Sequence, residues 1–269
     1  MGRMGWILVG LASLASMATA QAPGPIPAAP PDFKLLVASY GLGTVPVYTE
    51  ELVAISGRVY QFASNSHEVV VIEPARSRVA LLDLDRRLQS EISFGQLEAG
   101  LARVKARLAG ESDRREKTGR RADAVEAQMT RDLAEPRFAV AFDPEAHRVR
   151  LTNPSVEVVA VGEPDSDAPR VALAAQALDS IAKIGAFRTP NDLPPFAELE
   201  AVAALATVRK LRPTELTFLY RLAGPPQKFR RTYRLVLALT DRDREAIRRI
   251  DRLRESVPAV RYEKYRGDR

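Results

Sequence analysis

The chain has 269 residues, no cysteine, 46% hydrophobic residues and a formal net charge of +6. The apolar share allows an ordinary hydrophobic core, and the missing cysteine excludes disulfides and a lipid anchor on an N-terminal cysteine. The most basic stretch, residues 101–121, contains no aromatic side chain that could stack on a base, so we expect no nucleic-acid binding.

The first twenty residues, MGRMGWILVGLASLASMATA, follow the pattern of a secretory signal peptide. Arg3 gives a positive start, residues 6–14 form an apolar core, and Ala18-Thr19-Ala20 fits a cleavage site. This core is shorter than the roughly 20 apolar residues of a transmembrane helix, and no later run approaches that length. We therefore expect export to the periplasm or the extracellular space, with an uncleaved anchor as the alternative.

Residues 21–32, QAPGPIPAAPPD, contain five prolines and predict an extended Pro/Ala-rich tether. Residues 33–257 then predict a single α+β domain, which could divide into sub-halves 33–162 and 163–257. Its first part consists of short segments rich in Val, Ile, Tyr and Phe, joined by short turns. This pattern favours an antiparallel meander. We place the strands at 33–40, 45–49, 51–55, 58–63, 68–73, 78–84 and 87–92.

The hairpin EVVVIEPARSRVALLD, residues 68–83, is apolar at consecutive positions where a half-exposed strand would alternate apolar with polar residues. Both faces of the sheet must therefore be covered here, either by more protein or by a ligand. The ligand interpretation makes an apolar groove of the side chains on these strands. The alternative makes the same side chains sheet core. The candidate groove residues are Tyr60, Phe62, Val69, Val71, Val79 and Leu81.

The apolar spacing changes from strand to helix at Ser93. Ser93 and Gln96 have capping-box spacing, which predicts a helix over 94–109 that Gly110 interrupts. The charged residues 111–121 are expected to be mobile, and a second helix is expected over 121–134. A second group of strands follows at 137–143, 149–152 and 156–162.

The last third predicts helices, two strands and a final helix. A helix over 171–185 should end at Gly185, and an Ala-rich helix should run from 194 to about 211. Strands are expected at 215–222 and 229–239. Thr240 predicts the start of a last helix, and residues 258–269 are expected to form a flexible basic tail.

The sequence offers no recognisable reaction chemistry. His67 and His147 lie in predicted turns without zinc-site spacing, and neither a nucleophile elbow nor a phosphate-binding loop is present. Asp83 and Asp85 end a strand beside Arg86 and Arg87. They form an acid/base pair or a cation site, or, as we favour, a neutralised strand end. We therefore predict no catalytic residue, metal or cofactor, and we do not expect an enzyme.

Three consecutive segments carry a family resemblance: GRVYQFAS (57–64), EVVVIEP (68–74) and RVALLDLDRRLQSEI (78–92). They resemble the central meander of LolA-like lipoprotein carriers, and they are similar to uncharacterised exported bacterial proteins with a YQF-type strand. The resemblance implies a curved antiparallel sheet, an incomplete barrel, with helices on its concave side.

These observations lead to two functional hypotheses. The first is a non-enzymatic envelope or periplasmic binding protein that holds an apolar or lipid-like ligand between sheet and helices. The alternative is a structural or interaction module without a small ligand, whose Arg-rich helices meet an acidic envelope partner. The sequence fixes neither the ligand nor the oligomeric state.

Overall fold

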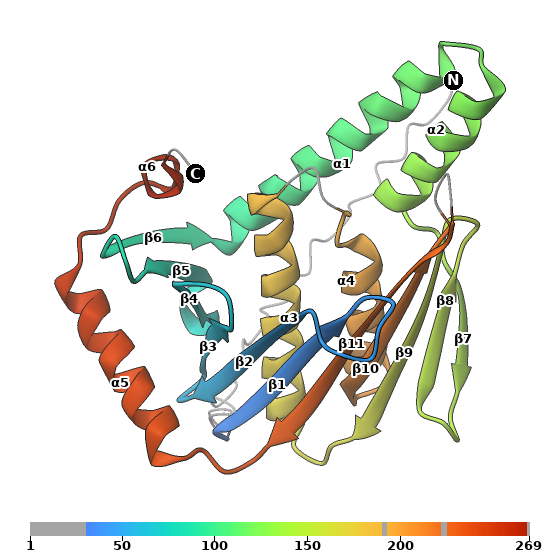
Figure 1. The fold of residues 1–269 in the computed structure, drawn as a ribbon. Coiled ribbons are helices and arrows are strands. Elements are labelled where there is room, and N and C mark those ends of the chain that lie inside the picture. Colours follow the sequence, from blue (N-terminus) through green and yellow to red (C-terminus); the bar gives the residue numbers. More distant parts are fainter. Residues whose placement is uncertain (1–30, 190–192, 222–224, 268–269) are drawn as a thin grey trace, which may run out of the picture.

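The computed structural model describes residues 31–189, 193–221 and 225–267. The expected signal peptide, and the tether up to residue 30, lie outside the described residues. Within the described part, eleven strands form one open, curved antiparallel sheet, and six α-helices pack around it (Figure 1). This confirms the predicted α+β class and antiparallel sheet.

The strands follow the order β6-β5-β4-β3-β2-β1-β11-β10-β9-β8-β7 across the sheet. Two meanders therefore meet at the pairing of β1 with β11, which come from opposite ends of the domain. The strands are β1 (Phe33–Tyr40), β2 (Tyr48–Ile55), β3 (Arg58–Ala63), β4 (Glu68–Glu73), β5 (Arg78–Asp83), β6 (Leu88–Ser93), β7 (Ala139–Asp143), β8 (Arg148–Thr152), β9 (Val156–Pro164), β10 (Leu211–Tyr220) and β11 (Gln227–Val236).

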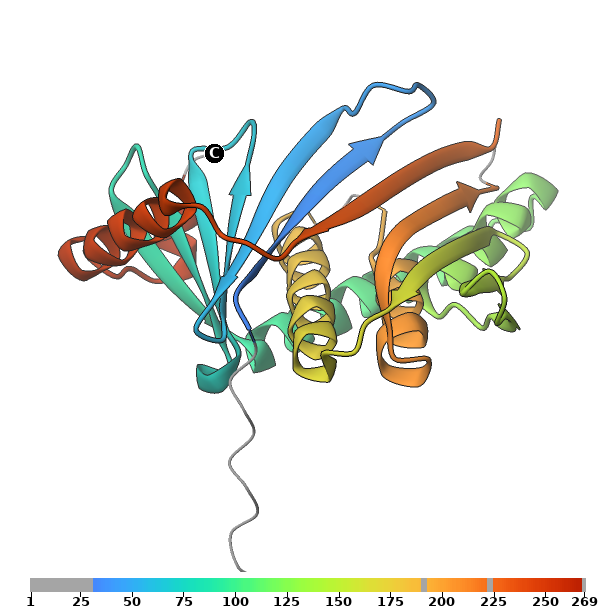
Figure 2. The ribbon, with the colours of Figure 1, turned by 90° about the horizontal axis from the view of Figure 1, so that it is seen from below.

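The helices cover both faces of this sheet. They are α1 (Phe94–Glu116), α2 (Arg121–Ala134), α3 (Ala168–Arg188), α4 (Phe196–Ala203), α5 (Asp241–Ser256) and α6 (Tyr262–Arg266). Figure 2 shows the sheet arching over α3 and α4, whereas α5 lies on the outer side of the N-terminal meander. The helical hairpin of α1 and α2 projects at one end of the molecule (Figure 1).

The two faces of β4 explain its unbroken run of apolar residues. All six residues of β4 are buried. Val70 and Ile72 point into the main core on the concave side, and Val69 and Val71 pack on the outer side with α5. Because protein covers both faces of this strand, its sequence does not alternate between apolar and polar residues.

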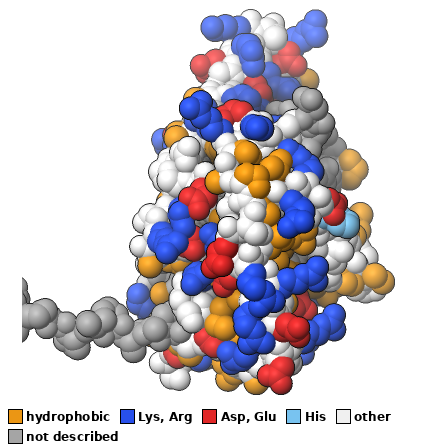
Figure 3. Space-filling model, turned by 90° about the vertical axis from the view of Figure 1, so that its left-hand side faces the viewer, with side chains coloured by type: hydrophobic (Ala, Val, Ile, Leu, Met, Phe, Trp, Pro, Cys, Tyr) orange, Lys and Arg blue, Asp and Glu red, His pale blue; other side chains and the backbone are white. Residues whose placement is uncertain are grey.

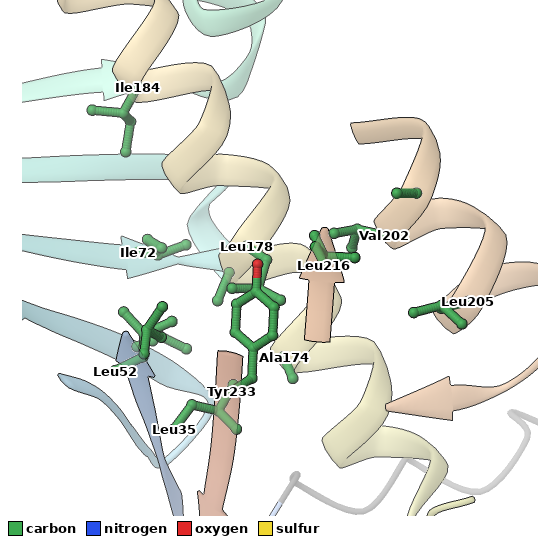
Figure 4. Close-up of a cluster of buried hydrophobic side chains, with 14 of the residues drawn as sticks. Leu35, Leu52, Ile72, Ala174, Leu178, Ile184, Val202, Leu205, Leu216 and Tyr233 are labelled. Atoms are coloured by element: carbon green, nitrogen blue, oxygen red, sulfur yellow. The ribbon is translucent and has the colours of Figure 1, made fainter. Parts of the chain in front are cut away.

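The main core joins both parts of the domain on the concave side of the sheet. Figure 4 shows Leu35, Leu52 and Ile72 of the N-terminal meander close to Leu178 of α3 and Val202 of α4. The possible sub-halves therefore share one core. α1 crosses α3 at Gly100, where an added Cβ would lie 2.6 Å from the Phe187 ring, so only glycine permits this approach.

α1 starts where the sequence predicts but runs beyond Gly110. Ser93 and Gln96 form the expected capping box. The helix continues to Glu116 because its second half packs on α2: the buried Ser112 hydroxyl donates to the Ala127 carbonyl at 3.0 Å. Arg115 forms an ion pair with Glu126 across the same pair of helices. The expectation that residues 111–121 are mobile was therefore wrong for the part up to Glu116.

Two further helix ends differ from the sequence prediction. α3 passes Gly185 and ends at Arg188, whose guanidinium pairs with buried Glu68, and Thr189 caps the helix by donating to the Gly185 carbonyl at 3.0 Å. α4 ends at Ala203 and a π-helical turn (Ala204–Val208) follows it. Leu211 begins strand β10 because it pairs with the end of β9, so the helix expected to reach residue 211 was too long.

The tail expected to be flexible is ordered up to Gly267. The Val260 amide donates to the Gln89 carbonyl at 2.8 Å, which attaches the tail beside β6. α6 follows, and the Tyr265 side chain is only 2% exposed. Tyr265 donates to Glu68, and Arg86 donates to the Tyr265 carbonyl at 2.7 Å. Sequence patterns miss this because α6 is too short to show an apolar stripe.

Candidate functional site

A cavity of about 430 Å³ opens on the concave side, where β1, β2 and β11 meet the C-terminal end of α3 and the segment before α4. Its walls are largely apolar, and its floor carries charged side chains. The apolar lining includes Val47, Ile181, Ile184, Leu193, Phe218 and Phe229. The polar lining includes Ser39, Glu50, Gln61, Glu198 and Arg231.

The alternation of the strands aims the polar floor at the cavity. Ser39 lies opposite Arg231 in the β1–β11 pairing, and the Arg231 Nε donates to the Ser39 hydroxyl at 3.2 Å. The Arg231 Nη1 also donates to Glu198, which stands in the first turn of α4, where the helix dipole favours a carboxylate. Gln61 of β3 donates to Glu50 of β2. Four strands and one helix thus contribute to a single polar cluster.

Burial and charge shift the proton equilibria of this cluster. Burial raises the pKa of Glu50, and the hydrogen bond from Gln61 and the charge of Arg231 oppose the rise. The Glu198 carboxylate raises the pKa of Arg231. Burial also raises the pKa of Tyr48 to about 12 and raises that of Tyr220. At neutral pH the cluster therefore offers a guanidinium and protonated phenols, groups that donate hydrogen bonds to a polar ligand head.

Replacing Glu50 by Gln is expected to raise stability at neutral pH. Because the folded-state pKa of Glu50 is raised, its protonated form stabilises the native state, and this contribution is lost as pH rises through the folded-state pKa. Gln keeps a neutral partner for Gln61 and removes that pH dependence. Urea unfolding of both proteins at several pH values between 4 and 8 measures how the free energy of unfolding depends on pH. Equal pH slopes for the two proteins would contradict the buried, shifted carboxyl.

A second cavity, about 540 Å³, lies between α3 and α4. Its lining comes mainly from the two helices, through residues such as Val171, Ala175 and Val202. Its lining also includes the charged residues Asp165, Asp179 and Lys210. The first cavity differs because strands as well as helices line it, and because hydrogen bonds join Ser39, Arg231 and Glu198 in its polar lining. It therefore combines more of the features of a ligand site.

The six residues of the predicted groove do not lie together. Val79 and Leu81 belong to the core on the concave side, whereas Tyr60, Phe62, Val69 and Val71 lie on the outer face under α5. Tyr60, Val71, Val79 and Leu81 are completely buried, at 0% exposure, and are sheet core. Phe62 and Val69 alone of the six line an open groove, which runs beside α5.

Sequence patterns gave no warning of the polar floor. Arg231 and Glu198 lie far from Glu50 along the chain, and only the β1–β11 pairing brings them together. The one local signal is a polar residue at an inward strand position. Gln61 stands between Tyr60 and Phe62, so it faces the side opposite to these aromatic rings.

The other residues considered from sequence have structural surroundings. The Asp83 carboxylate accepts from the Arg86 amide at 2.8 Å and so caps the β5–β6 turn. Exposed His67 pairs with Asp85 at 3.2 Å. Among residues 31–189, 193–221 and 225–267, no group of three or more His, Cys, Asp or Glu side chains could hold a metal ion. Nor does any helix in these ranges have the length and apolar character needed to span a membrane.

Fold and site together define an α+β protein with an open, curved antiparallel sheet. A cavity on the concave side of this sheet has charged side chains on its floor. No protein-family model matches the sequence, and no curated protein is similar enough to count as a relative.

Proposed function

We propose that the protein is a non-enzymatic binding protein of the cell envelope, exported by its N-terminal signal, which holds an apolar or lipid-like ligand in the concave cavity. The main observation in support is the cavity between sheet and helices, which has apolar walls above a polar floor. Its volume of about 430 Å³ falls within the usual range for small-molecule sites. The apolar walls would contact the body of the ligand, and Arg231 would contact its polar head.

Exposed apolar side chains beside the cavity support this proposal. The β1–β2 loop carries Leu42, Val45 and Val47, which are 88%, 75% and 74% exposed. Val47 also lines the cavity, as does half-exposed Phe229 on β11. Apolar side chains gathered at the rim of a cavity are typical of a site that admits an apolar ligand.

The architecture also fits the family resemblance. A LolA-like carrier implies a curved open sheet with helices on the concave side, and this chain has a sheet of that kind with α3 and α4 in that position (Figure 2). We therefore extend the resemblance from the central meander to a proposal for the whole domain.

The alternative interaction module has less support. The basic stretch 101–121 lies on the projecting hairpin, but several of its cations are already paired. Lys105 pairs with Glu135, Arg107 with Glu111, and Arg115 with Glu126. This pairing reduces the positive field available to an acidic partner.

Gly185→Leu tests the proposal by filling the cavity. Gly185 lines the cavity on α3, and an added Cβ there meets nothing within 4 Å. The variant should fold and gain up to about 1 kcal/mol of stability from helix propensity. We expect organic extraction and mass spectrometry of wild-type protein, purified from its native envelope, to recover a lipid-like molecule that the variant lacks.

Gly110→Leu is the matched control. Gly110 lies inside α1, outside the cavity, and an added Cβ there also meets nothing within 4 Å. This variant should gain similar stability and keep the bound molecule. Recovery of the same molecule from all three proteins, or of none from the wild type, would overturn the proposed function.

A further inference from the structure

A separate groove of about 680 Å³ lies on the outer side of the sheet, between α5 and the ends of β3, β4 and β5. Its floor is apolar, and three arginines border it. The floor residues are Phe62, Val69, Leu84, Ala246, Ile250 and Leu253. The arginines are Arg87, Arg249 and Arg252. Figure 3 shows this side of the molecule, where blue Lys and Arg side chains lie among hydrophobic and acidic ones.

Two of the six arginines of α5 are paired, and two others border the groove. Arg244 and Arg254 are paired, with Asp32 at 3.1 Å and with Glu73 at 3.2 Å. Arg249 and Arg252 are exposed and have no ion-pair partner within the described part of the chain. The lining of the groove includes no Asp or Glu. An anion placed there would meet positive charge without a competing carboxylate.

We propose that this groove is a second binding site, for an anionic amphiphile with a phosphate monoester head and an alkyl tail. The planar guanidinium forks of Arg249 and Arg252 match phosphate oxygens in geometry and charge. The apolar floor beside them, with buried Val69 and Ile250, would take the first part of the tail. The sheet separates this site from the concave cavity, so it goes beyond the function proposed above.

A substitution of Arg87 tests the proposal in a way that separates a loss of binding from a loss of folding. Arg87 has φ of 50°, in the left-handed region that glycine and asparagine adopt more readily than arginine. Arg87→Asn should therefore keep or raise the melting temperature, because asparagine adopts this backbone conformation with less strain. The same change removes a guanidinium from the groove, so binding should weaken although the fold is at least as stable.

Isothermal titration calorimetry of the lipid-stripped mature chain measures the binding. The probe is dodecyl phosphate below its critical micelle concentration, compared with dodecylphosphocholine and with inorganic phosphate. We expect saturable binding of dodecyl phosphate, weakened roughly tenfold or more in R249Q/R252Q because two charge-assisted contacts are lost. The control R242Q/R248Q removes the same charge from exposed α5 positions outside the groove, and its affinity should change less than about twofold.

Four results would overturn this second site. They are no binding by the wild type, equal losses in both double variants, equal affinity for dodecylphosphocholine, and inorganic phosphate binding as tightly as dodecyl phosphate. Gly185→Leu separates the two proposals, because it closes only the concave cavity. If that variant alone abolished dodecyl phosphate binding, the amphiphile would belong to the concave cavity, which would refute the groove site and leave the proposed function standing.

Discussion

Replacing Tyr265 by Ala is expected to lower the free energy of unfolding by about 3–5 kcal/mol, the usual cost of emptying a buried aromatic site. The Tyr265 ring is only 2% exposed, and the Arg86 guanidinium lies 6.0 Å from its centre. Its hydroxyl donates to Glu68, a carboxylate that is itself buried. The substitution therefore removes apolar contacts and one donor to a buried charge. Denaturant unfolding measures the loss.

Two further variants separate the contribution of the Tyr265 ring to stability from that of its hydroxyl. Tyr265→Phe keeps the ring and should cost about 1.5–3 kcal/mol, the value of a hydrogen bond to a charged group. Lys264→Ala changes an exposed side chain on the same short helix and should change stability by less than about 0.5 kcal/mol. If Tyr265→Ala proved as mild as Lys264→Ala, α6 would not be packed on the sheet in solution.

Arg231→Met should destabilise the protein by about 2–3 kcal/mol at neutral pH. Breaking a fully buried ion pair costs about 3–5 kcal/mol, and solvent screening reduces this because the Arg231 side chain is 29% exposed. The carboxylate of Glu198 keeps its burial but loses its cation. The positive charge near Glu50 also disappears, so Glu50 takes up a proton more readily. The penalty should therefore shrink as pH falls toward 4.

A double variant separates charge from packing. In Arg231→Met/Glu198→Gln the second change removes the carboxylate that the first leaves alone, so it should recover about 1–2 kcal/mol. Urea unfolding of the two single variants and the double variant gives the coupling energy. Strictly additive losses, with no dependence on pH, would show that the two side chains do not interact in solution.

The sequence predicted the elements whose signals are local. The capping box of Ser93 and Gln96 set the start of α1, because both partners lie within one helical turn. Strands β3 and β4 have the predicted bounds, since turn residues border their apolar runs on both sides. The helix ends at Gly110 and Gly185 were misjudged because contacts with α2 and with Glu68 outweigh the roughly 1 kcal/mol penalty of a helical glycine.

The concave site lay beyond such reasoning. The alternation of side chains along a strand does not distinguish an inward-facing Arg231 from an inward-facing valine. The sequence also does not show which strand lies beside β11. The outer groove was not predicted as such, although Phe62 and Val69 of the predicted groove line it. The sequence indicated only Arg-rich helices, and the packing of α5 showed which of its arginines border the groove and which pair with residues of the sheet.

The pairing of β1 with β11 has a consequence for how the chain acquires its structure. β1 emerges first from a ribosome or a translocation channel, and its hydrogen-bonding partner β11 follows only after nearly the whole domain. Until then β1 is an open strand edge, able to pair with another chain. Such distant pairing also slows folding, because a long loop must close before the contact forms. The nascent domain is therefore most prone to aggregate through this edge in the interval before β11 arrives.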